Sequence, residues 1–234
     1  MSDVEVHIEL AGATQRVGLL RRNRGRRGQT ISFEYDDAWL KDSNCFSLEP
    51  ALSLTPGTFH PPQDRSIFGS IGDSAPDTWG RQLMQRAERR RAEAEGRVVR
   101  TLSEVDYLLG VSDETRLGAL RFRGVGDAVF QSPLGEGVPA LIKLGQLMES
   151  SQRILRNEET DDDLQLIFAP GSSLGGARPK ASVADPHNHL CIAKFPKDSD
   201  GYSLETWEEI AMRLADNAGI TTRPINFVRS LKRP

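Results

Sequence analysis

The 234-residue sequence is poor in the features that mark several classes of protein. It has only two cysteines, Cys45 and Cys191, so neither a disulfide scaffold nor a cysteine-based zinc site is expected. No apolar run approaches the ~20 residues that a membrane-spanning helix requires. Its N-terminus, from Met1 to Leu10, carries acidic side chains and no apolar segment, which excludes a signal peptide. These absences predict a cytoplasmic protein that does not contact a membrane.

Neither sign of charge dominates, because 30 Lys and Arg residues face 33 Asp and Glu residues, for a formal net charge of −3. The chain therefore lacks the overall basicity of a histone-like nucleic-acid binder. Arginines gather at 21–27 and 89–91, where they could contact DNA phosphates, but a solvated surface is the favoured interpretation. Hydrophobic residues make up 38%, which is enough for a folded core.

Local patterns predict an α+β protein. Alternating apolar residues indicate antiparallel strands at 4–10, 16–20 and 31–35, with the arginine-rich segment 21–27 as a loop. A Gly/Pro-rich stretch over 124–139 is the best candidate for a boundary between two parts of the chain. Further strands are expected at 118–123, 181–184 and 190–195, and helices from Asp77 onward, over 102–109, over 141–155 and after Thr160.

The segment 171–180, which reads GSSLGGARPK, is rich in glycine and serine. Such a loop can point several backbone N–H groups at one anion, as phosphate-binding loops do. The segment does not fit a Walker A motif in any register. Taken alone it is a weak signal, because a glycine-rich loop is more often a plain surface turn.

The strand at 190–195 places Lys194 on the same face as Leu190 and Ile192. A lysine is rarely buried on an apolar face without a partner. The alternative is an edge position in which the stem lies flat and the ammonium group reaches water.

The next helix is expected to begin after Ser203 as N-cap and to end before Gly219. Glu208 lies at the border of its apolar stripe, so it needs a cationic partner, and Lys194 is the predicted one. The residues of the stripe, predicted to pack on the core with the tryptophan as an anchor like Trp79, are Trp207, Ile210, Ala211, Leu214 and Ala218.

This order of glycine-rich loop, strand lysine and helix glutamate is the small-lobe arrangement of protein kinases. Together with DSAPDTWGRQLM and GALRF upstream, the segments SSLGGARPKA, IAKFP and ETWEEIAMRLADNAGI resemble HipA-type serine/threonine kinases, the toxins of bacterial toxin–antitoxin modules. The resemblance covers nearly the whole chain and is most specific over 172–219. It implies an N-terminal subdomain over 1–130 with a small antiparallel sheet, followed by a kinase-like small lobe over 135–234.

The resemblance also implies a site, a cofactor and partners. The cofactor is ATP with Mg²⁺, and Ser173 matches the serine whose autophosphorylation switches the kinase off. The family has an HTH-type antitoxin as partner, contacts DNA mainly through that antitoxin, and in some members acts on an aminoacyl-tRNA synthetase. The residues that the resemblance places at the nucleotide are Ser173, Leu174, Gly175, Gly176, Lys194 and Glu208.

One departure from the family concerns catalysis. Phosphoryl transfer needs an Asp that positions the attacking hydroxyl, and an Asn and an Asp that hold Mg²⁺. The family carries these in a C-terminal lobe, and the sequence up to Pro234 contains no matching run. We therefore expect the ATP-binding part of a kinase toxin, inactive alone and without catalytic or metal-binding residues of its own. The alternative is a non-catalytic HipA-like module that docks an antitoxin or another partner.

Overall fold

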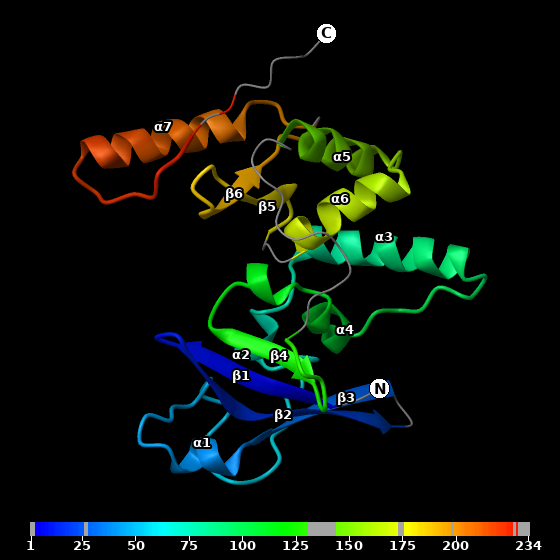
Figure 1. Ribbon diagram of the computed structural model, residues 1–234, viewed down its shortest axis with the longest axis vertical. Helices are drawn as coiled ribbons and strands as arrows, with labels where there is room; N and C mark the ends of the chain where they lie inside the picture. The colour runs from blue at the N-terminus through cyan, green and yellow to red at the C-terminus, as the bar shows by residue number, and fades with distance from the viewer. Residues whose placement is uncertain are drawn as a thin grey trace.

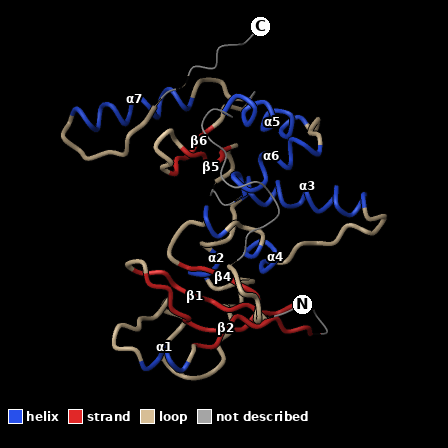
Figure 2. The backbone as a smooth tube through the Cα atoms, in the orientation of Figure 1, coloured by secondary structure: helices blue, strands red, loops and turns tan. Residues whose placement is uncertain are grey.

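The computed structural model describes residues 3–25, 28–130, 144–172, 176–197, 199–226 and 228. Helices and antiparallel sheets occur together, which confirms the predicted α+β class (Figure 1). A four-stranded sheet lies at one end of the molecule and a two-stranded sheet with the long helices at the other, as the backbone tube also shows (Figure 2). Within the described residues, no helix is long and apolar enough to cross a membrane.

The larger sheet has the strand order β3-β2-β1-β4, and all of its neighbours are antiparallel. Val4 and Val6 are fully buried, and they alternate with Glu5 and His7, which point to the other face. The strands are β1 (Val4–Leu10), β2 (Ala13–Gly25), β3 (Gly28–Tyr35) and β4 (Leu120–Gly124).

Residues 21–25 of the arginine-rich segment do not form the loop that the sequence predicts, because β2 continues to Gly25. Residues 26–27 lie outside the described residues. Arg21 pairs with Asp3 on one side and with Glu34 of β3 on the other. The Arg22 side chain is buried and faces Asp106. Carboxylates on neighbouring elements thus make an arginine-rich sequence compatible with a paired strand.

The first hydrophobic core lies under the larger sheet. Its largest fully buried side chains are Trp39, Phe33, Phe68 and Phe122. Short helices cover this core, and Arg116, itself buried, donates to the carbonyls of Ser74, Leu108 and Val111. The helices of this part are α1 (Asp37–Lys41), α2 (Gly69–Gly72), α4 (Glu104–Leu109) and the 3₁₀ turn Asp113–Thr115.

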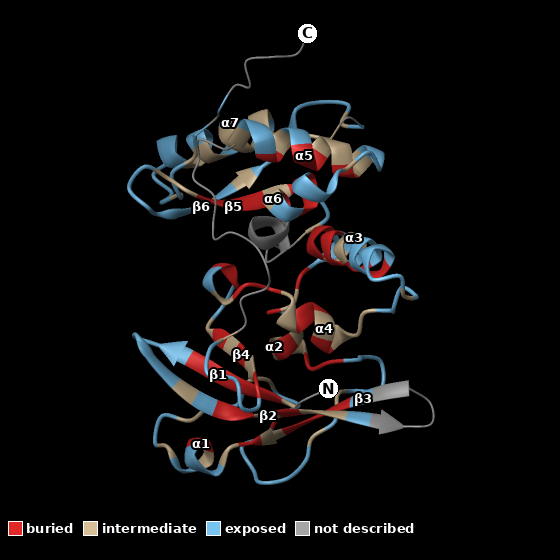
Figure 3. Ribbon diagram, turned by 45° about the vertical axis from the view of Figure 1, so that its right-hand side comes forward, coloured by how far each residue is buried: buried red, intermediate tan, exposed pale blue. Residues whose placement is uncertain are grey.

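A second core joins α3 (Thr78–Ala94) to elements much later in the chain. Trp79 and Leu83 of α3 are fully buried in this core. Figure 3 shows buried residues along α3. The packing of α3 shows that the second core includes a helix that precedes the predicted boundary at 124–139. That boundary lies largely outside the described residues and stays a prediction. The later elements are α5 (Leu144–Arg156), α6 (Asp161–Ser172), β5 (Lys180–Ala184) and β6 (Leu190–Lys194).

Helix α7 (Leu204–Asn217) has the caps that the sequence predicts. The Ser203 side chain accepts from Thr206 N, and Gly219 adopts a positive φ of 77°. The predicted packing of its apolar stripe is wrong: no residue of α7 is buried, and Trp207 is 59% exposed (Figure 3). Glu208 of this helix contacts Lys194 of β6.

Candidate anion-binding site

The candidate site is built on the pair of strands β5 and β6. Their register sets Lys180 directly opposite Lys194, and Ser182 opposite Ile192. Directly opposed residues point to the same face of a sheet, so both lysines leave one face of the pair. The other face, with Ala181 and Val183, packs into the second core.

The face that carries Lys194 is exposed, which corrects one premise of the sequence argument. Leu190 and Ile192 share this face as predicted, yet each is more than half exposed. The Lys194 side chain is 46% exposed. Its ammonium group is therefore not a buried charge that requires neutralisation.

The predicted contact between Lys194 and Glu208 is nevertheless present. Lys194 Nζ donates to Glu208 Oε1, which joins β6 to α7 across 14 residues of sequence. Both side chains are substantially exposed, so the pair adds only about 0–1 kcal/mol to stability. The contact directs the Lys194 ammonium group toward α7.

Lys180 is a residue of the site that the sequence argument missed. A Cβ atom added at Gly176 would lie 2.7 Å from Lys180 Nζ, so the lysine tip reaches the end of the glycine-rich loop. Burial, together with the charge of Lys194, lowers the pKa of Lys180. The register of two short strands would have revealed it, but the sequence alone does not fix that register.

Arg178 ties the loop to the start of α7. Its guanidinium donates to Asp200 Oδ1 at 2.9 Å and to Glu205 Oε1 at 2.8 Å. The Arg178 guanidinium lowers the pKa of Asp200 to about 2. Glu205 therefore pairs with Arg178, in addition to its favourable interaction with the helix dipole in the first turn of α7.

The start of α3 holds Gly176 from the other side. Gly176 N donates to Asp77 Oδ2 at 2.6 Å, and Trp79 N donates to Gly176 O at 3.1 Å. The Trp79 side chain adds a third hydrogen bond, from Nε1 to Lys180 O at 3.0 Å. Gly176 has a φ of +91°, a conformation that favours glycine.

The structure therefore brings Gly176, Lys194 and Glu208 of the predicted set into one region, and adds Lys180. The predicted residues Ser173, Leu174 and Gly175 lie outside the described residues. Among the residues that the structure describes, no group of three or more His, Cys, Asp or Glu side chains could hold a metal ion.

The donor set fits a phosphate group. It offers the ammonium groups of Lys180 and Lys194 on one face of the strand pair, and the missing side chain of Gly176 leaves room for the Lys180 tip. Exposure of the face leaves these groups accessible to a ligand from solvent. Multiply charged oxyanions are the ligands that neighbouring ammonium groups prefer.

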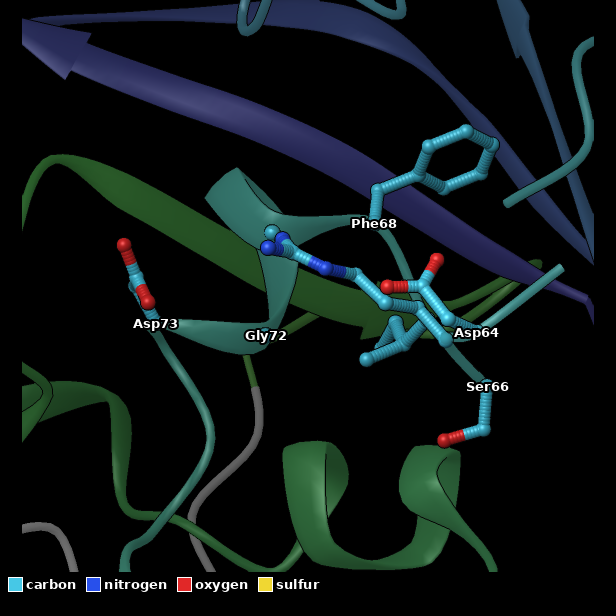
Figure 4. Close-up of a pocket in the computed structure, with 8 residues that line it drawn as sticks. Asp64, Ser66, Phe68, Gly72 and Asp73 are labelled. Carbon is cyan, nitrogen blue, oxygen red and sulfur yellow. The ribbon is translucent and has the colours of Figure 1, made fainter. Parts of the chain in front are cut away.

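A pocket of about 310 Å³ in the N-terminal half does not belong to this site. It lies along the segment before and within α2, where Asp64 and Asp73 flank the lining and Phe68 turns toward the sheet (Figure 4). Its mixture of acidic side chains with Arg65 gives no clear preference for one kind of ligand.

Two family models match the chain. The HipA N-terminal domain matches residues 8–123, and the HipA-like C-terminal domain matches residues 172–233. The two matches do not overlap, and the second contains the glycine-rich loop, both site lysines and α7. No curated protein matches the chain.

Proposed function

Because the chain belongs to the HipA family, we propose that its C-terminal half binds the phosphates of ATP, as the nucleotide-binding part of a HipA-like serine/threonine protein kinase. The observation that carries the proposal is the Lys194–Glu208 ion pair, with Lys180 directly opposite Lys194 and its ammonium group against Gly176. This is the order of loop, strand lysine and helix glutamate that protein kinases use.

Each residue has a distinct part in this proposal. Lys194 and Lys180 supply the positive charge of the site. Glu208 orients the Lys194 ammonium group through the ion pair. ATP, when bound, supplies the phosphoryl group that a kinase transfers.

Membership of the family supports a wider role that belongs to the same proposal. In this role the protein is a toxin of a toxin–antitoxin module, with an HTH-type antitoxin as partner and Ser173 as an autophosphorylation site. Co-expression with the antitoxin encoded beside it, followed by co-purification, tests the partnership. Phosphopeptide mapping of a chain that also carries the C-terminal lobe of the family, after incubation with Mg-ATP, tests Ser173, and absence of phosphate there contradicts that part.

Calorimetric titration of the full chain with ATP, with and without Mg²⁺, tests the binding proposal. We expect saturable binding by the unaltered chain and a loss of at least about tenfold in affinity for Lys194→Ala, which corresponds to about 1.4 kcal/mol. Lys41→Ala is the matched control, because Lys41 is an exposed lysine on α1 in the N-terminal half. Equal affinities for the two variants would contradict the proposal.

A further inference from the structure

The hydrogen bonds between the start of α3 and the loop carry an inference about the control of this site. Asp77 and Trp79 bind both the N–H and the carbonyl of Gly176, and Trp79 also binds Lys180 O. These two residues therefore hold both ends of segment 176–180, the last part of the glycine-rich segment. They are 97 to 101 residues upstream of that segment.

The Asp77 carboxylate does not cap the helix that it precedes. Asp77 is the N-cap residue of α3, where an aspartate side chain commonly accepts a hydrogen bond from its own helix. Here it makes no such bond, and its Oδ2 accepts from Gly176 N instead. The side chain is thus directed at the loop and not at the helix that it precedes.

The hydrogen bonds join a rigid helix start to a residue with a constrained backbone. Trp79 is fully buried in the second core, so the start of α3 is a rigid reference. Gly176 sits at a positive φ with the Lys180 tip against it, so a change in its backbone would displace that ammonium group. The Gly176–Asp77 bond involves a charged acceptor, which makes it stronger than a neutral one.

We propose that Asp77 is a positioning residue of the site: its hydrogen bond to Gly176 N holds Gly176, and with it the Lys180 ammonium group, in the position that receives the nucleotide phosphates. The role rests on the proposed function, because it concerns the affinity of that same site. It assigns to a residue matched by the N-terminal family model a task in the C-terminal half.

The contact itself can be tested without nucleotide. Amide hydrogen exchange of the full chain, resolved at Gly176 by NMR, should be faster in Asp77→Ala than in the unaltered chain. Asp77→Asn should retain the protection, because its amide oxygen can accept the same bond. Asp73→Ala removes an exposed aspartate upstream of α3 and should change nothing at Gly176.

The consequence is tested by ATP titration of the same variants. We expect about tenfold weaker binding for Asp77→Ala, equivalent to about 1.4 kcal/mol, and near-normal binding for Asp77→Asn and Asp73→Ala. If Asp77→Ala does not fold, Asp77→Ser serves in its place, since serine is a good N-cap but lacks the carboxylate.

The outcomes separate the two proposals. ATP binding by the unaltered chain with equal or tighter binding by Asp77→Ala would overturn the role of Asp77 alone, and tighter binding would mean that the carboxylate competes with the phosphate. Failure of Asp77→Asn to rescue affinity would also overturn it. Absence of ATP binding by the unaltered chain would overturn the proposed function, and the role of Asp77 with it.

Discussion

Lys180 and Lys194 face each other across the β5–β6 pair, and both side chains leave the same exposed face. Like charges directly opposite in a sheet are destabilising, and the proximity of Lys194 contributes to the lowered pKa of Lys180. Glu208 contacts Lys194, and the charges of Asp77 and Glu208 act on Lys180. An anion that contacts both ammonium groups would relieve this repulsion.

The first prediction concerns Lys180 as the second cation of the site. Lys180→Met should weaken ATP binding by about tenfold and reduce its dependence on salt, because one charge contact is lost. Titrations at several salt concentrations measure both effects, with Lys41→Met as the control. Unchanged affinity and an unchanged salt dependence would remove Lys180 from the site.

The second prediction concerns the attachment of α7. Arg178 binds carboxylates of both the preceding turn and the first turn of α7, whereas no apolar residue of α7 is buried. Arg178→Met should therefore raise amide exchange across Leu204–Asn217 and weaken ATP binding through Glu208. Arg213→Met is the control, since Arg213 pairs only with Glu209 of its own helix among the contacts shown. Equal exchange in the two variants would show that other contacts hold the helix.

The third prediction compares Trp79 and Trp207, which the sequence pattern predicts to be core residues alike. Trp79 is fully buried, so Trp79→Ala should lower the free energy of unfolding by about 3–5 kcal/mol. Trp207 is 59% exposed, so Trp207→Ala should change it by no more than about 0.5 kcal/mol. Urea denaturation of each variant measures the difference. A large loss for Trp207→Ala would mean that its side chain is covered in solution.

The fourth prediction concerns pH. The Arg97 guanidinium, 2.6 Å from the Glu88 carboxylate, lowers the pKa of Glu88 to about 2 from its ordinary 4.5. The ionised carboxylate therefore stabilises the fold above pH 4.5, and that contribution is lost as the pH falls toward 2. Glu88→Gln should cost about 1–3 kcal/mol at neutral pH.

The matched control for Glu88 is Glu93→Gln, since Glu93 is an exposed residue of the same helix. Unfolding by urea at neutral and at acidic pH should show the cost of Glu88→Gln shrinking as the solution is acidified, with no such trend for Glu93→Gln. A cost that is independent of pH would contradict the assignment.

Regular periodicity explains why much of the fold follows from the sequence. The strand 4–10, helix α3 and the caps Ser203 and Gly219 depend on local spacing and on local hydrogen bonds, and all are present as predicted. The pairing of Lys194 with Glu208 also follows, because a strand and the next helix of a kinase-like order lie close together.

The remainder depends on contacts that no local pattern encodes. The stripe that contains Trp207 is amphipathic, but periodicity does not say whether another element covers it. The bond between Gly176 and Asp77 joins residues 99 positions apart. Arg21 and Arg22 can lie in a strand because other segments supply carboxylates that pair with them.

The most direct measurement of the central claim is a double-mutant cycle on ATP affinity with Lys194→Met and Glu208→Gln. Glu208 acts through Lys194 in this account, so Glu208→Gln should weaken binding in the unaltered chain and have almost no effect when Lys194 is already methionine. Equal losses from Glu208→Gln in both backgrounds, or no loss in either, would contradict it.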